Sequence, residues 1–276
     1  MPKFIVGARL HDYGKGSPDE LFGRVAADSF AAVQLAYKKC VPSVRSYADV
    51  TDALVAETVA AEKAHSIQVA VLGTYVELAI NDESRLKNAA DFKSQLAVCK
   101  PLGAGCIGTE TTSMAKQPAG TTREEAQELL CRSLADILPA AEALGVTVAV
   151  EPVTYHSMNS AAATRHILDT MRSPNLKVIF DMSNLVDAGN VGAQDRIWND
   201  VGELLGDQIV AVHFKGQAFA PDGGLLHTSL EDSLTDYAGA FAMLRQLPQD
   251  ALPVLREEAV PARAASDIAF MRGFFA

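Results

Sequence analysis

Four ionisable side chains follow apolar runs in the second half of the chain. Glu151, Asp181 and Glu257 are carboxylates and His213 is an imidazole. Carboxylate oxygens joined by one imidazole suit Mn²⁺, Mg²⁺ or Co²⁺, and Zn²⁺ less exclusively. Without a cation, three carboxylates brought together would repel one another, and some would have to take up protons. The four residues therefore predict a site for one divalent cation.

The apolar runs that precede these residues are typical of buried parallel strands. Near-continuous Val, Ile, Leu and Ala is expected where both faces of a strand are covered. Amphipathic helices are predicted between them, the first with Ser17 as N-cap in a capping-box pattern and the third closing on Gly145 as C-cap. The expected helices include 17–30, 47–66 and 122–145. The expected strands are 4–10, 31–37, 68–75, 103–110, 145–151, 176–181, 208–214 and 252–258.

Eight strand–helix alternations in 276 residues predict one α/β domain, a single (β/α)8 TIM barrel over residues 1–276. A doubly wound open sheet is the alternative, but no G-x-G-x-x-G follows the first run. Active sites of such barrels lie at the C-terminal ends of the strands. The first four strands end near His11, Gln34, Glu77 and Glu110. His11 and Glu110 are therefore candidates to line the site opposite the cation.

The composition argues for a small-molecule enzyme. The net charge of −10 disfavours a nucleic-acid partner. The first apolar run is too short for a signal peptide, and no run approaches the ~18 apolar residues of a membrane span. The four cysteines form no C-x-x-C pair and are too few for a disulfide scaffold, which favours ordinary reduced thiols. We expect a cytoplasmic protein without membrane contact, and a homo-oligomer stays open.

Four short motifs resemble the xylose isomerase-like TIM-barrel sugar isomerases and epimerases. VEPVTYH is similar to the family's fifth-strand motif of a metal-binding Glu followed by His, and IFDMSNL to its sixth-strand D-x-x-[HN]. VHFKG resembles the seventh-strand H-x-K-[DG], and PVLREE the eighth-strand Glu. ARLHDYG, VQLAYKK and VLGTYVE resemble the first three strands more loosely. Similarity thus extends over nearly the whole chain.

The resemblance implies a fold, a cation and roles for named residues. The metal ligands would be Glu151, Asp181, His213 and Glu257, with Glu258 as the alternative to Glu257 and Mn²⁺ as the expected cation. By similarity to ketose 3-epimerases, Glu151 and Glu257 would also act as acid and base. A ketose bound to the cation through its carbonyl would lose the neighbouring C–H proton through an enediolate. Reprotonation from the opposite face gives epimerisation, and return to the neighbouring carbon gives isomerisation.

Residues beside the motifs are expected to bind the hydroxyl groups of the sugar substrate. These are His156, Asn184 and Lys215, and Asn184 stands where many relatives carry His. A surface lysine is the alternative interpretation of Lys215. His227 lies in the glycine-rich segment APDGGLLHTSL, where it could belong to a lid or to plain surface.

Three other functions stay open. A metal-dependent lyase or dehydratase, or a relative that cleaves C-glycosides, would use the same proton abstraction. A phosphodiesterase like the abasic-site endonucleases would need more histidines and a basic groove. A sugar-binding protein without catalysis is the third. The identity of the sugar is open, although the absence of arginine from FKGQAFAPDGG favours an unphosphorylated one.

Overall fold

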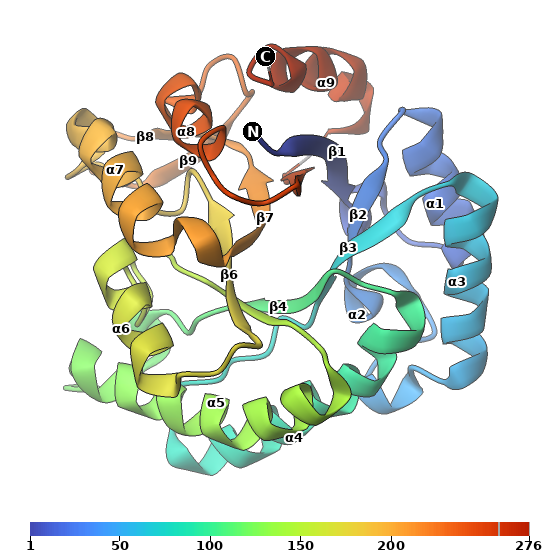
Figure 1. Cartoon of the computed structure of the whole chain (residues 1–276), viewed down its shortest axis with the longest axis horizontal. Helices are drawn as coiled ribbons and strands as arrows, with labels where there is room; N and C mark the ends of the chain where they lie inside the picture. The colour runs from blue at the N-terminus through green and yellow to red at the C-terminus, as the bar shows by residue number, and fades with distance from the viewer. Residues whose placement is uncertain (259, 276) are drawn as a thin grey trace.

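A computed structural model describes residues 1–258 and 260–275. Eight parallel strands close into a barrel in the order β1-β10-β7-β6-β5-β4-β3-β2, and helices surround it (Figure 1). The predicted (β/α)8 barrel is confirmed. Its strands are β1 (Lys3–Arg9), β2 (Ala32–Leu35), β3 (Gln68–Gly73), β4 (Cys106–Glu110), β5 (Val148–Glu151), β6 (Leu176–Asp181), β7 (Ile209–Phe214) and β10 (Ala251–Arg256).

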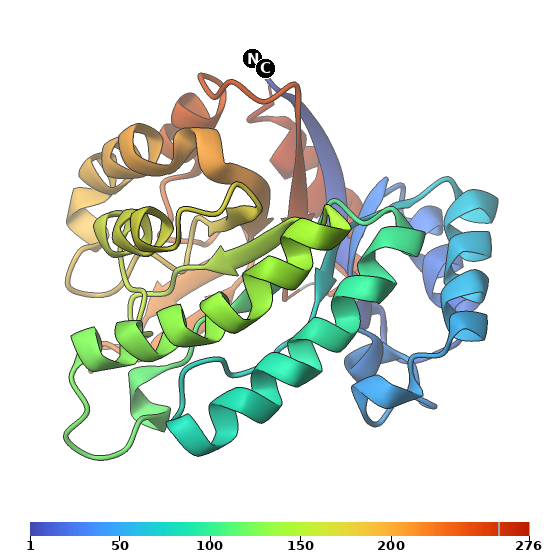
Figure 2. The ribbon, with the colours of Figure 1, turned by 60° about the horizontal axis from the view of Figure 1, so that its bottom comes forward.

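The helices form an outer ring in which sequence neighbours pack together. Helices α4 and α5 lie side by side along much of their length (Figure 2). Within the described residues, no helix is both long and apolar enough to cross a membrane. The helices are α1 (Pro18–Ala27), α2 (Tyr37–Cys40), α3 (Asp52–His65), α4 (Asp82–Leu102), α5 (Arg123–Leu144), α6 (Ala161–Met171), α7 (Gln194–Leu205), α8 (Tyr237–Leu244) and α9 (Ala264–Arg272).

Helix caps explain where several predicted boundaries were wrong. Gly145 closes α5 with φ of 66°, a left-handed conformation that favours glycine, so β5 begins only at Val148. Gly103 closes α4 in the same way, which delays β4 to Cys106. The capping box at Ser17 is confirmed. The first helix nevertheless ends at Ala27, three residues before the predicted boundary.

Three other predicted segments are shorter or interrupted. The run 31–37 forms a strand only over Ala32–Leu35, and the run 252–258 only up to Arg256. The predicted helix 47–66 is divided into a 3-10 turn, Tyr47–Asp49, and α3. Thr51 begins α3 because its side chain accepts a hydrogen bond from Leu54 N.

A two-stranded hairpin stands where a glycine-rich loop was expected. β8 (Gly216–Phe219) pairs antiparallel with β9 (Leu225–Thr228), immediately after β7. Gly216 is required there, because a Cβ atom would lie 2.3 Å from Ser229 O. His227 lies on β9 with an exposed side chain.

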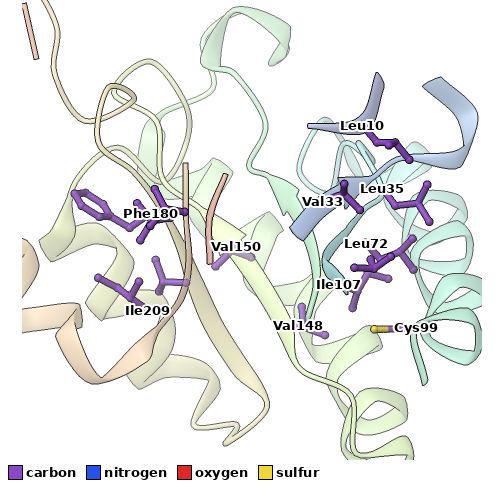
Figure 3. Close-up of a cluster of buried hydrophobic side chains, with 14 of the residues drawn as sticks. Leu10, Val33, Leu35, Leu72, Cys99, Ile107, Val148, Val150, Phe180 and Ile209 are labelled. Carbon is purple, nitrogen blue, oxygen red and sulfur yellow. The ribbon is translucent and has the colours of Figure 1, made fainter. Parts of the chain in front are cut away.

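Alternate residues of each strand face opposite sides of the barrel wall. Val148, Val150 and Phe180 face the helices and belong to the main hydrophobic core (Figure 3). The residues between them face the barrel axis, where small apolar side chains fill the lower interior. We call this set the apolar layer: Ala32, Ala70, Val71, Cys106, Ala149, Ile179, Ala211 and Leu255.

Candidate functional site

The four predicted ligands occupy the next inward-facing positions after the apolar layer, toward the C-terminal ends of the strands. Each of them follows a residue of that layer by two positions, as the period of a strand requires. Side chains at these positions share the barrel interior at the C-terminal ends of β5, β6, β7 and β10. All four are nearly inaccessible to solvent: Glu151 is 3% exposed, Asp181 0%, His213 1% and Glu257 4%.

His213 lies between two of the carboxylates. Its Nδ1 is 3.2 Å from Oε2 of Glu151 and 3.3 Å from Oε1 of Glu257. Glu258 instead turns away and forms an ion pair of 2.9 Å with Arg9. Glu257 is therefore the glutamate of this pair that joins the cluster.

Lys215 and Asn184 connect the remaining carboxylate to the same cluster. Lys215 Nζ lies 2.9 Å from Asp181 Oδ2 and donates to Asn184 Oδ1 at 2.8 Å. Asn184 Nδ2 in turn donates to Glu151 Oε1 at 2.6 Å. Lys215 is 7% exposed, so it is not the surface lysine of the alternative interpretation. Both residues lie next to the ligand set, as the motifs predicted.

Burial and mutual charge set the protonation of the cluster. Burial raises the pKa of Glu151, and His213 opposes this only in part. Burial would also raise the pKa of Asp181, but the ammonium of Lys215 and then His213 hold it below its usual value. Burial would lower the pKa of His213, yet Glu257 and Glu151 raise it to about 9. The site thus attracts positive charge, whether as protons or as a cation.

The donor atoms fit a divalent cation. Glu151, Asp181 and His213 each offer one ligand atom, and these atoms all lie within 4.8 Å of one another. Among the described residues, Nε2 of His213 has no hydrogen-bond partner, whereas Nδ1 faces the two glutamates. An unpaired buried nitrogen is costly, and coordination to a cation would satisfy it. These three residues could therefore hold a metal ion, and Glu257 lies beside them.

Glu110 and His11, which were expected to line the site opposite the cation, both lie at the C-terminal ends of strands, and Glu110 adjoins the cluster. Glu110 lies beside Glu151 in the register of β4 and β5 and lines a small cavity with Glu151, His213 and Glu257. Burial and the charge of Glu151 raise the pKa of Glu110 to about 7. Burial, and then Arg9, lower the pKa of His11 to about 3, so its imidazole is neutral near pH 7.

Two residues of this wall were not singled out from the sequence. Tyr75 lines the same cavity, accepts a hydrogen bond from Gln34 Nε2 at 2.9 Å and makes an edge-to-face contact with His11. Arg9 Nη1 lies 3.8 Å from Glu257 Oε2. Both could have been identified from the sequence by their position, because each lies within two residues of the C-terminal end of a predicted strand.

The partners of the His156 and Glu77 side chains lie outside the four-residue cluster. His156 Nδ1 lies 3.4 Å from Thr111 Oγ1, and burial lowers the pKa of its imidazole to about 4. A substrate contact by His156 stays a prediction. Glu77 forms an ion pair with Lys116 at the rim. The remaining histidines, His65 and His166, lie in α3 and α6.

Solved structures with this architecture include named sugar epimerases. A 3-keto-D-glucoside 4-epimerase, YcjR from E. coli, is 17% identical with a TM-score of 0.72 over 98% of this chain and 100% of its own. D-allulose 3-epimerase from Methylomonas sp. is 14% identical, with a TM-score of 0.72 over 99% of each chain. The IOLI protein, solved with a zinc atom, is 16% identical, with a TM-score of 0.76 over 98% of this chain and 96% of its own. At these identities the likeness shows a shared fold.

Sequence comparison identifies the family directly. No curated protein matches the chain. A family model described as xylose isomerase-like TIM barrel matches residues 22–273, which is most of the chain. The barrel order and the acidic cluster at its mouth agree with that match. The chain belongs to the xylose isomerase-like TIM-barrel family.

Proposed function

We propose that the protein is a divalent-metal-dependent sugar isomerase or epimerase that acts on a ketose-type carbohydrate. One observation carries the proposal: Glu151 and Glu257 approach the same nitrogen of His213, at 3.2 and 3.3 Å. Two carboxylates at one buried point can serve as base and acid for one carbon atom. The names of the similar structures, two sugar epimerases and one zinc-containing protein, support this reading.

The ligands of the cation would be Glu151, Asp181, His213 and Glu257, with Mn²⁺ as the expected metal. A bound cation supplies positive charge that stabilises the negative charge that develops on the substrate oxygens. Asp181 is prepared for this role, because Oδ1 already accepts hydrogen bonds from the backbone of Ser183 and Asn184 at 2.7 and 3.0 Å. Those bonds orient the carboxylate before any ligand arrives.

The protein supplies the proton transfer through its paired carboxylates. One of Glu151 and Glu257 takes the proton from the carbon next to the substrate carbonyl. The other returns a proton to the opposite face, which inverts the centre, or to the neighbouring carbon, which isomerises the sugar. Asn184 holds Oε1 of Glu151, so the Oε2 oxygen remains directed at His213. The proposed reaction requires the two carboxylates to act on opposite faces of the substrate carbon.

Groups around the cluster are suited to sugar hydroxyls. Lys215 and Asn184 present polar atoms beside the ligands, and neutral His11 can donate or accept a hydrogen bond. Glu110, with its pKa raised to about 7, can also do either near neutral pH. Together with His156, these are the proposed substrate-binding residues.

Proton NMR in D₂O tests the proposal. Metal-stripped protein is incubated with a panel of free ketoses, and the measurement is repeated after Mn²⁺ is added. We expect metal-dependent exchange of a C–H next to a carbonyl and an isomeric product whose formula differs only by the exchanged deuterium. A product lighter by one water would instead identify a dehydratase. Exchange that is equally fast without metal would contradict the proposal.

A further inference from the structure

A second cavity adjoins the cluster on its β5–β7 side. Its volume is about 270 Å³, and it lies between the loops after β5 and β6 and the β8–β9 hairpin. The lining residues of interest are Thr154, Tyr155, Asn184, Asp187, Phe219 and Leu225. We call it the hairpin cavity. Pockets for a whole drug-sized ligand usually measure about 300–1,000 Å³, so this one is sized for part of a ligand.

The hairpin cavity is continuous with the proposed reaction site through Asn184. That side chain lines the cavity and also bonds Glu151 and Lys215. Tyr155 also lines the cavity, and its ring makes an edge-to-face contact with His156, with centroids 4.7 Å apart. A group in the cavity would therefore lie one side chain away from the carboxylate pair.

The lining combines exposed apolar surface with polar atoms. Tyr155 is 53% exposed and Leu225 43%, although large apolar side chains are usually buried, and Phe219 of the same lining is partly exposed. Clustered exposed apolar side chains mark a binding surface. Asp187 and Thr154 add oxygen atoms that can bond hydroxyl groups. A pyranose ring carries both matching features, an apolar C–H face and equatorial hydroxyls.

We infer that the hairpin cavity binds the second sugar ring of a glycoside whose ketose unit occupies the cluster of Glu151, Asp181, His213 and Glu257. The inference rests on the proposed function and narrows its substrate from free ketoses to ketoses joined to another sugar. The second ring would stack on Tyr155 and Phe219 and bond Asp187. The hairpin that was absent from the sequence prediction would then serve as one wall of a specificity site.

Calorimetric titration of the Mn²⁺-loaded protein tests the inference. The probes are D-fructose and two disaccharides in which fructose carries a pyranose, lactulose at O4 and isomaltulose at O6. We expect at least one disaccharide to bind about tenfold more tightly than fructose, which equals about 1.4 kcal/mol. That gain is the size expected of a stacked aromatic contact, about 0.5–1.5 kcal/mol. Equal affinity for all three sugars overturns the inference.

Matched variants assign the gain to this cavity. Tyr155→Ala and Phe219→Ala should reduce the disaccharide preference to about threefold or less, whereas Tyr155→Phe keeps the ring and should keep the preference. Leu225→Ser removes apolar surface from the cavity wall and should also lower the preference. Leu86→Ser, at a leucine that is 60% exposed on α4, is its control and should leave the preference unchanged. A preference that survives both alanine variants overturns the inference. If fructose undergoes C–H exchange but the disaccharides bind no more tightly, only the inference is overturned. If no sugar binds and no sugar undergoes exchange, the proposed function is overturned as well.

Discussion

The barrel interior contains two layers that the same strands build two residues apart. In the apolar layer, Ala149, Ile179, Ala211 and Leu255 are at most 2% exposed and contact apolar neighbours. In the layer above, the next inward residues are Glu151, Asp181, His213 and Glu257, which are equally buried. Backbone geometry and burial therefore match, and only the chemistry of the side chains differs.

The difference shows what makes a buried charge tolerable. Every ionisable group of the upper layer has a partner of opposite charge or a polar neighbour within about 4 Å, such as Asp181 with Lys215 at 2.9 Å. The apolar layer offers no such partner among its members. A charged residue substituted into the apolar layer would have no partner of opposite charge. A neutral residue substituted into the upper layer would leave the partner of the lost charge unpaired.

The largest expected effect comes from a charge placed in the apolar layer. Ala211→Asp puts a carboxylate at a position that is 0% exposed, with only apolar neighbours of its layer around it. We expect a loss of several kcal/mol, comparable to the whole stability of about 5–15 kcal/mol of a typical domain. Urea unfolding and the yield of folded protein measure it.

Ala53→Asp is the matched control for this substitution. Ala53 is exposed in the first turn of α3, where a negative charge is favourable. The control should fold with unchanged or slightly higher stability. If Ala211→Asp costs no more than about 1 kcal/mol, the contrast between the layers is not one of charge compensation.

Proton transfer should suffer the next largest effect. Glu151→Gln and Glu257→Gln keep the shape of each side chain and remove its basicity. We expect each to slow exchange of the substrate C–H by about 10²–10⁴, measured by NMR in D₂O. Glu77→Gln removes a carboxylate that pairs with Lys116 at the rim, and it should leave exchange unchanged. If all three variants slowed exchange equally, the carboxylates of the upper layer would have no special role in proton transfer.

The layers also explain which parts of the site were predictable from sequence. The apolar runs predicted the barrel, and the period of two along a strand places Glu257, two residues after Leu255, in the interior. Glu258 lies beyond the end of β10 with φ of 51°, and its side chain pairs with Arg9. The choice between Glu257 and Glu258 was thus available from the pattern, although the sequence analysis left it open.

Contacts between distant segments were not available from the pattern. Arg9 and Tyr75 reach the mouth from β1 and from the loop after β3, and their partners become visible only when the barrel closes. The β8–β9 hairpin was missed because each strand has only four residues, and the turn between them, with Pro221 and two glycines, was interpreted as part of a longer loop. Both failures concern tertiary pairing, whereas the strands were predicted from local composition.

Removing the positive charge of Lys215, beside the upper layer, should have an intermediate effect on stability. Lys215→Met leaves Asp181 buried without the ammonium that lies 2.9 Å away, at a cost of about 3 kcal/mol. Mn²⁺ should then stabilise the variant more than the wild type, since it would supply the missing charge. Thermal unfolding with and without Mn²⁺ measures both changes.

Lys177→Met serves as the comparison for this variant. Lys177 lies on β6 outside the cluster and donates one hydrogen bond to Gln208 at 2.7 Å. Its loss should cost about 1 kcal/mol and leave the Mn²⁺ effect as in the wild type. An equal Mn²⁺ effect in both variants would mean that Lys215 does not compensate the carboxylates.

The smallest effect concerns the boundary between the layers, where Gly108 lines the site cavity and Ile179 belongs to the apolar layer. A Cβ atom at Gly108 would lie 2.5 Å from Ile179 Cδ1, so Gly108→Ala should cost about 1–3 kcal/mol by overpacking. Ile179→Val removes that methyl group and alone should cost about 0.5–1.5 kcal/mol.

The double variant decides whether the two layers share one rigid boundary. Because Ile179→Val vacates the space that the new Cβ needs, the combined loss should fall short of the sum by about 0.5 kcal/mol or more. Urea unfolding of the four proteins of the cycle measures this coupling. Additive losses would show that the boundary relaxes around Gly108. In that case the layers would differ in charge but not in packing, and the glycine would be required only by the space it leaves for substrate.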